Sequence, residues 1–143
     1  IGGTKVGAML GEAVVITNPA IAEDFRYIIK QRGGMLAKGW LLGVQFDTLF
    51  TDELYVSIAS HGNMLADRIR TVIFDAGYSL AYPGTTNQIF AILPNRVLDK
   101  LGKEFSYSFW GKADEDHSIV RFCTSWATRP EDVDALCEKI QSI

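Results

Sequence analysis

The chain has 143 residues, with 14 Lys and Arg against 17 Asp and Glu and a formal net charge of −3. Its hydrophobic fraction of 48% and charged fraction of 22% are ordinary for a globular protein with a sizeable core. It has neither the basic stripe of a nucleic-acid-binding protein nor an apolar run long enough to span a bilayer. We therefore expect neither nucleic acid nor a membrane as a partner. Cys123 and Cys137 lie among apolar neighbours, which favours buried thiols in a cytoplasmic protein over a disulfide.

The N-terminal part begins inside a glycine-rich turn, residues 1–5, with no initiator methionine. We therefore expect the chain to be a piece of a larger protein. The apolar segment 8–16 predicts a buried strand. The sequence Thr-Asn-Pro then predicts the start of a helix over 19–31, which the glycine pair 33–34 ends. A second helix is predicted over 36–50.

The C-terminal part has a different rhythm. Asp52 is predicted to cap a long helix that runs to Ala76 and ends at Gly77. A capping box, Thr128 to Glu131, predicts the start of a final helix that ends near residue 140. Between these helices we expect four short strands, over 78–82, 88–93, 105–110 and 118–123. A short helix is expected over 95–103, between the second and third strands.

This pattern predicts an α/β to α+β fold with three parts. Residues 1–50 would be the end of a larger domain, and residues 51–77 a long connecting helix. Residues 78–143 would form a small α+β domain with antiparallel strands.

Lys5 is the first candidate for chemistry, because small residues crowd it on both sides, in Gly2-Gly3-Thr4-Lys5-Val6-Gly7. Such crowding allows a planar ligand to approach the amine, and an activated lysine amine can attack a carbonyl carbon. The alternative is an exposed lysine in a glycine turn, which the local sequence alone favours. A phosphate-binding loop is less suitable, because the glycine–lysine spacing does not match Walker A.

Arg121 is the second candidate, because it lies inside the apolar segment 119–123. A buried guanidinium needs an anionic partner, and arginine can grip a carboxylate at two points. A ligand carboxylate and a structural salt bridge to an Asp or Glu are equally compatible with the sequence.

Lys30 is the third candidate, since cations gather beside the glycine pair 33–34. Cations are also favourable at a helix C-terminus for electrostatic reasons alone. His61 and His117 have no Cys or His partner at metal-ligand spacing, so no metal site is predicted. There is also no Ser-His-Asp arrangement.

Several segments together resemble the threonine aldolase/β-eliminating lyase family of fold-type-I pyridoxal-phosphate enzymes. They occur in the right order from the first residue to the last, and the final segment is the most specific. They are Gly-Gly-Thr-Lys-x-Gly, Ile-Lys-Gln-Arg-Gly, Leu-Ala-Lys-Gly-Trp-Leu-Leu-Gly-Val-Gln-Phe, Thr-Asn-Gln and Arg-Phe-Cys-Thr-Ser-Trp-Ala-Thr.

The resemblance implies a role for each candidate. Lys5 would bind pyridoxal 5'-phosphate covalently, beside Thr4 as a further cofactor-binding residue. Arg121 would hold the α-carboxylate of an amino-acid substrate, and Lys30 would help to bind it. Asn87 and Gln88 would face the cleft without an assigned role.

The resemblance also implies a reaction and an assembly. We expect retro-aldol cleavage of threonine-like β-hydroxy-α-amino acids to glycine and an aldehyde by the parent protein. The alternatives are β-elimination from an aromatic or cysteine-like amino acid, and a non-enzymatic α+β interaction module. Because the family's large domain lies mostly before the lysine, the 143 residues alone are expected to be inactive. A homodimer or tetramer of the parent would leave apolar surface exposed around 8–16.

Overall fold

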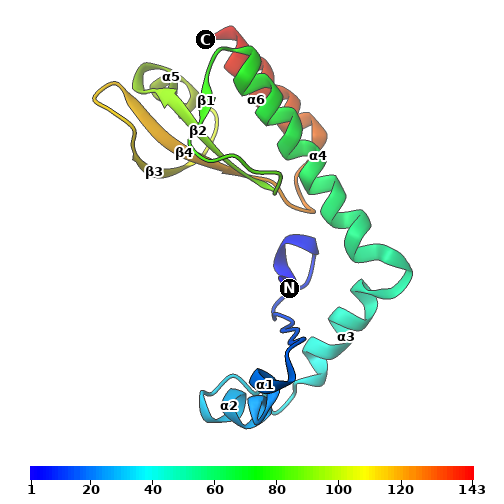
Figure 1. The fold of residues 1–143 in the computed structure, drawn as a ribbon. Coiled ribbons are helices and arrows are strands. Elements are labelled where there is room, and N and C mark those ends of the chain that lie inside the picture. Colours follow the sequence, from blue (N-terminus) through cyan, green and yellow to red (C-terminus); the bar gives the residue numbers. More distant parts are fainter. The chain divides into compact units, whose positions relative to one another are not determined.

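The computed structural model describes all 143 residues and confirms the predicted mixed α/β class, with a four-stranded antiparallel sheet (Figure 1). The chain divides into two compact units, Ile1–Ser57 and Ile58–Ile143. The two units meet within the long helix α4 (Leu54–Asp75). None of the helices combines the length and the apolar character that a membrane span needs.

The first unit contains only short elements before α4 begins. They are η1 (Thr4–Val6), α1 (Pro19–Ala22), α2 (Phe25–Gln31), α3 (Trp40–Leu49) and η2 (Thr51–Glu53).

The strand predicted over 8–16 is wrong. The only pairing there is an isolated bridge between Gly2 and Glu12. A strand needs a neighbour to accept and donate its backbone hydrogen bonds, and this unit contains no other strand. The segment therefore remains irregular, and Val14 and Val15 are 66% and 67% exposed.

The helix predicted over 19–31 begins as expected but is divided in two. Asn18 caps α1, where its side chain accepts a hydrogen bond from the Ala20 amide at 3.0 Å. The chain then turns at Asp24, whose φ of 54° is left-handed, and α2 starts at the next residue. The helix ends at the glycine pair as predicted, with Gly33 at a φ of 76°.

The starts of the next two helices also differ from the prediction. Turns occupy residues 37–39, so α3 starts at Trp40. Asp52 does not cap α4, because it lies within η2 at a φ of 51°. The predicted end of α4 is confirmed, since Gly77 adopts a φ of 80° just beyond it.

The second unit is built on one sheet with the order β1-β2-β4-β3, in which every pair is antiparallel. The central pair runs from Gln88 opposite Cys123 to Pro94 opposite His117. Alternate residues of β2 and β4 are buried, so one face of the sheet packs against helices and the other is open. The strands are β1 (Ser79–Leu80), β2 (Gln88–Pro94), β3 (Ser108–Lys112) and β4 (His117–Cys123).

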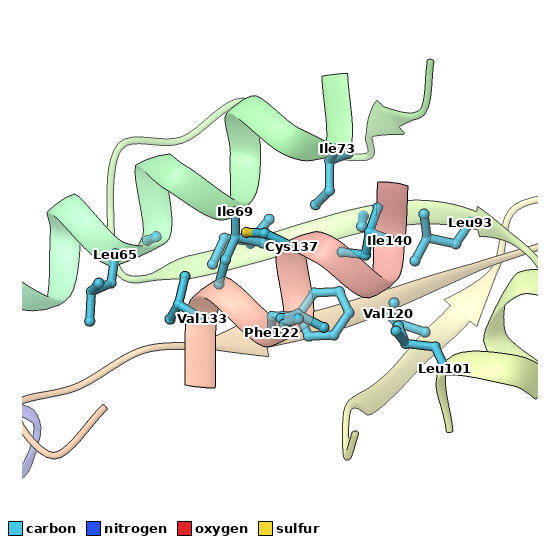
Figure 2. Close-up of a cluster of buried hydrophobic side chains, with 14 of the residues drawn as sticks. Leu65, Ile69, Ile73, Leu93, Leu101, Val120, Phe122, Val133, Cys137 and Ile140 are labelled. Atoms are coloured by element: carbon cyan, nitrogen blue, oxygen red, sulfur yellow. The ribbon is translucent and has the colours of Figure 1, made fainter. Parts of the chain in front are cut away.

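The core lies between the buried face of the sheet and the helices α4, α5 (Asn95–Leu101) and α6 (Pro130–Ser142) (Figure 2). Leu65, Ile69 and Ile73 recur at intervals of four along α4 and form an apolar stripe on one side of this part of the helix. Each fully buried aliphatic side chain of this kind contributes about 1.5–3 kcal/mol of hydrophobic stabilisation. The sheet and the other helices supply Ile89, Ala91, Leu93, Leu98, Leu101, Val120, Phe122, Val133, Leu136, Cys137 and Ile140.

The predicted capping box at the start of α6 is wrong. Thr128 instead accepts a hydrogen bond from the Ser125 amide at 2.9 Å, which closes the turn before the helix. Arg129 is the N-cap residue, has no side-chain capping bond and forms an ion pair with Asp132. Pro130 is the first residue of the helix, a position that suits proline.

The two cysteines differ in burial. Cys137 is buried as expected, and burial raises the pKa of its thiol. Cys123 is exposed, contrary to the prediction, because it lies at the end of β4 on the open face of the sheet. Both are free thiols.

Candidate functional site

Lys5 lies in the single turn η1 between two glycines. The Gly3 carbonyl accepts hydrogen bonds from the amides of Val6 at 3.1 Å and Ala8 at 3.0 Å, and both of these side chains are buried. Gly7 ends the turn in the left-handed conformation, at a φ of 96°. The buried residues anchor the turn, and Lys5 is left exposed at its surface.

Close packing around Gly3 holds this turn in place. A Cβ atom on Gly3 would lie 2.8 Å from the Ala8 Cβ and 3.2 Å from the Gly11 carbonyl oxygen. The Tyr55 hydroxyl donates a hydrogen bond to the Gly2 carbonyl at 2.9 Å, which ties the turn to the start of α4. The backbone that presents Lys5 is therefore constrained although the lysine side chain is not.

Thr4, Lys5 and Lys30 all lie in the first unit, and all three are exposed. Lys30 is in the last turn of α2. None of the ion pairs in the structure involves Lys5 or Lys30. Figure 1 draws the N-terminal turn and α2 apart within this unit.

Arg121 lies in the second unit, in the inner strand β4, opposite Phe90 of β2 and Ser108 of β3. Its neighbours Val120 and Phe122 point into the core, so Arg121 points to the open face of the sheet. Local sequence placed it in a strand, and the alternation of β4 decides which face it occupies.

The Arg121 guanidinium has no acidic partner in the structure, so the structural salt bridge considered as an alternative is wrong. Its Nη1 donates to Gln88 Oε1 at 3.3 Å, and its Cζ lies 5.3 Å from the centre of the Trp110 ring. Its Nε is enclosed without a hydrogen-bond partner. Arg121 therefore has no acidic partner and has an unsatisfied donor, which is the state expected of a group that binds an anion.

A row of aromatic side chains adjoins Arg121 on the same face. Tyr82 packs edge-on against Phe90 with ring centres 5.3 Å apart, and Phe90 packs edge-on against Trp110 at 5.0 Å. Trp110 lies at an irregularity of β3, between the paired residues Phe109 and Gly111. Such bulges redirect a side chain, and here the redirected ring lies against the guanidinium.

Arg70 is a functional candidate that sequence reasoning missed. It is only 7% exposed, in the middle of α4. It pairs with Asp67 and donates to the Thr86 carbonyl oxygen, and it also donates to the Gln88 carbonyl oxygen at 3.3 Å. The position of Arg70 beside the apolar stripe of an amphipathic helix could have indicated a buried charge. A buried charge needs hydrogen-bonding or ionic partners.

Asn87 immediately precedes β2, outside the strand, and the structure gives its side chain a role. Its side-chain amide donates to the Thr124 carbonyl oxygen at 2.7 Å, and its own carbonyl accepts from the Thr124 amide at 3.0 Å. The Thr124 hydroxyl in turn donates to the Gly62 carbonyl of α4 at 2.7 Å. These bonds join the ends of β2 and β4 to the helix, directly beside Gln88 and Arg121.

A cavity of about 400 Å³ lies at this end of the sheet, and Arg121, Ser108, Thr124 and Asp132 are among its lining residues. The Arg129 guanidinium holds the pKa of the Asp132 carboxyl below its ordinary value by hydrogen bonding. Asp132 is therefore paired with a neighbouring cation and does not neutralise Arg121.

The two histidines have local partners. His61 Nε2 lies 3.0 Å from the Thr128 carbonyl oxygen, at the turn before α6. His117 Nδ1 lies 2.9 Å from an Asp114 carboxylate oxygen, and this hydrogen bond is the main cause that lowers the pKa of Asp114. Neither histidine contacts Arg121.

Comparisons with known proteins give one consistent result. No protein-family model matches the chain. The low-specificity L-threonine aldolases of Pseudomonas aeruginosa and of a Pseudomonas species are each 32% identical to it over 146 aligned residues, or 99% of this chain. The chain spans about 40% of the length of these two relatives.

Solved structures agree with these relatives. The threonine aldolase of Leishmania major is 38% identical and superposes with a TM-score of 0.92, over 99% of this chain and 42% of that one. The 8-amino-7-oxononanoate synthase of Francisella tularensis shares the fold alone. It is 17% identical, with a TM-score of 0.59 over 88% of this chain and 39% of its own.

Proposed function

We propose, from the homology of this chain to the threonine aldolases, that it forms the C-terminal part of a pyridoxal-phosphate-dependent lyase. The reaction would be retro-aldol cleavage of a threonine-like β-hydroxy-α-amino acid to glycine and an aldehyde. The observation that carries the proposal is 38% identity and a TM-score of 0.92 to a threonine aldolase across 99% of the chain. Because the chain spans about 40% of its curated relatives, the activity is proposed for the complete gene product, and the 143 residues by themselves are expected to be inactive.

The residues around Lys5 fit covalent attachment of the cofactor. The amine is exposed, free of any ion pair and carried by a turn that Gly3 and Gly7 allow to be tight. A carbonyl carbon can reach an amine in such a position, and small neighbours leave room for a planar ring. Thr4 lies beside Lys5 with an exposed hydroxyl-bearing side chain, and we propose that it contacts the cofactor.

The state of Arg121 supports a role in binding the substrate's α-carboxylate. It carries an unneutralised charge on a sheet whose helix-facing side is a closed core. A guanidinium binds a carboxylate through two parallel hydrogen bonds, which fixes direction as well as distance. Lys30 is proposed as a second cation for the carboxylate, on the resemblance of its segment and its exposure without an ion pair.

Each group then has a defined part in the reaction. When bound, pyridoxal phosphate supplies an electron sink for bond cleavage at the substrate's Cα. Lys5 would hold the cofactor, and Arg121 would fix the carboxylate so that the Cα–Cβ bond stands in the orientation from which it can break. Positioning of this kind supplies several kcal/mol, on the order of 7–11 in the best cases.

We also propose that the complete protein is a homodimer or tetramer. The first unit exposes Met9, Val14 and Val15 to 86%, 66% and 67%, in the segment where an interface is expected. Contiguous apolar surface of this kind is commonly covered by another chain.

The test uses the complete gene product incubated with pyridoxal phosphate. Borohydride reduction should trap the cofactor on Lys5, located by peptide mass spectrometry, and threonine should be cleaved to glycine and acetaldehyde. Lys103→Ala, which removes an exposed lysine outside the segments of the resemblance, is the control and should keep both properties, whereas Lys5→Ala should lose both.

Other outcomes separate the alternatives. Activity on tryptophan, tyrosine or cysteine with none on threonine would replace the aldolase by a β-eliminating lyase. A colourless protein with unmodified Lys5 would leave only a non-enzymatic binding module.

A further inference from the structure

Two uncharged side chains hold the guanidinium of Arg121, one at its edge and one against its face. Gln88 accepts a hydrogen bond from Nη1 at 3.3 Å, and the Trp110 ring lies 5.3 Å from Cζ. Gln88 lies on β2 and Trp110 on β3, so the two come from the strands on either side of β4. The arginine is therefore held from both sides of its own strand.

The chemistry of these two partners differs from that of a structural ion pair. The Gln88 amide oxygen takes one N–H of the guanidinium and leaves its charge intact. The Trp110 ring attracts the cation through its π face, an interaction effective within about 6 Å of the ring centre. Together they restrict where the guanidinium points without neutralising it, which is what a carboxylate-binding arginine requires.

Gln88 is itself held from the other side of the sheet. The buried Arg70 donates to its carbonyl oxygen at 3.3 Å and also to the carbonyl of Thr86. The backbone N–H of Gln88 donates to the Thr86 hydroxyl at 3.3 Å. These hydrogen bonds fix the backbone at Gln88, and the Gln88 side chain extends from this backbone to Arg121.

Trp110 is held by its aromatic neighbour and by its backbone. Phe90, which is directly opposite Arg121 on β2, packs edge-on against the Trp110 ring at 5.0 Å. The irregularity of β3 at Trp110 directs this ring toward Arg121. Phe90 and the irregular strand together keep the ring against the guanidinium.

We propose that Gln88 and Trp110 are positioning residues that orient the Arg121 guanidinium for the α-carboxylate of an amino acid. The proposal rests on the proposed function, since it assumes that Arg121 binds a substrate carboxylate. It adds that the open face of the sheet, through these two side chains, sets the affinity for the amino acid. Neither residue takes part in breaking the bond at Cα.

The experiment measures kcat and KM for threonine, and the affinity for glycine from the change in cofactor absorbance, in the complete gene product. Gln88→Leu and Trp110→Leu should each raise KM and weaken glycine binding about 3- to 10-fold, with kcat changed less than about twofold, because the carboxylate contact is equal in the ground and transition states. Gln88→Glu should raise KM at least about 10-fold, because its carboxylate would pair with Arg121 in place of the substrate. Trp110→Phe keeps an aromatic face and should recover most of the affinity.

Phe109→Leu is the matched control. Phe109 neighbours Trp110 on β3, is 63% exposed against 50% for Trp110, and pairs with Val120, whose side chain points to the core side. It should change KM less than about twofold. A thermal unfolding curve for each variant tests whether the sheet is intact. Because Gln88 is exposed, its variants remove no side chain from the core.

The outcomes are separable. Should the wild-type protein cleave threonine while Gln88 and Trp110 variants keep its KM, or lose kcat alone, the positioning role is wrong and the proposed function stands. Should the wild-type protein neither bind the cofactor nor cleave threonine, the proposed function fails first and the positioning role fails with it.

Discussion

The two units of this chain carry apolar side chains in similar abundance but treat them differently. In the second unit, Ile73, Leu93 and Leu101 are completely buried between the sheet and its helices. In the first unit, Met9 is 86% exposed and Trp40 is 67% exposed. The second unit therefore closes a core from its own residues, whereas the first leaves large apolar side chains exposed.

The candidate residues follow the same division. Arg121 lies on a sheet whose hydrogen bonds and core fix its backbone. Lys5 lies in a single helical turn anchored by Val6 and Ala8. On the proposed roles, the arginine for the substrate carboxylate lies in the unit with its own closed core, and the lysine for the cofactor lies in the unit without one.

The largest difference between the units should appear when one side chain is truncated in each. Ile73→Ala removes a completely buried side chain from the core and should lower the free energy of unfolding by about 2–5 kcal/mol, through lost burial and a residual cavity. Val15→Ala, at a site 67% exposed, should change it by less than about 0.5 kcal/mol. Urea unfolding followed by near-UV circular dichroism measures both, and a loss above about 2 kcal/mol for Val15→Ala would show that another surface covers the first unit.

Removal of the buried cation in the second unit should have the next largest effect. Arg70→Met leaves the carbonyls of Thr86 and Gln88 without their donor and should cost about 2–4 kcal/mol. Arg68→Met is the control on the same helix, because its ion pair with Asp134 is about half exposed. It should cost less than about 1 kcal/mol. Equal losses from the two variants would contradict the anchoring role of Arg70.

Two glycines test the packing within the first unit. Gly3→Ala places a Cβ 2.8 Å from the Ala8 Cβ and should destabilise the turn that carries Lys5 by about 1–3 kcal/mol. Gly43→Ala, in α3 with no atom near its added Cβ, should instead stabilise that helix by about 0.5–1 kcal/mol. Hydrogen exchange of the two segments measures each effect locally. Slower exchange around Lys5 in Gly3→Ala would show that the close approach is not needed.

The smallest effect concerns a surface turn of the second unit. The hydrogen bond from His117 lowers the pKa of Asp114 from its ordinary value of 3.8. A carboxyl whose folded pKa is depressed stabilises the fold above its unfolded pKa, and this contribution is lost as the pH falls through the folded pKa. His117→Ala should therefore raise the Asp114 pKa part of the way to 3.8, as measured by NMR titration, and leave stability at pH 7 nearly unchanged. An Asp114 pKa that stays constant would rule out the His117 bond as the cause.

The sequence predicted the second unit better than the first, for a physical reason. The short, mostly apolar runs 88–93 and 118–123 predicted β2 and β4, and both strands find partners within the chain. The segment 8–16 has an equally apolar sequence but no strand beside it. A strand forms only when two segments exchange backbone hydrogen bonds. The apolar sequence of one segment alone therefore cannot establish a strand.

The candidate site shows the same limit. A lone arginine in an apolar strand made Arg121 a candidate, and a glycine-crowded lysine made Lys5 one. The resemblance gave Gln88 no role, and Trp110 carried no signal, because their contacts with Arg121 join residues 33 and 11 positions apart along the chain (121 − 88 and 121 − 110). Arg70 was missed because the burial of a helical residue depends on which elements pack against that helix.

The sequence by itself determined the apolar periodicity of β2, β4 and α4, the glycine and proline punctuation, and the residue types that suit a cofactor amine and a carboxylate grip. Only the tertiary structure decided that Arg121 has no acidic partner, that the Gln88 amide and the Trp110 ring hold it, and that Arg70 binds the Gln88 backbone carbonyl. Periodicity and turn chemistry act between near neighbours in the chain. Burial and the pairing of charges depend on segments brought together only by folding.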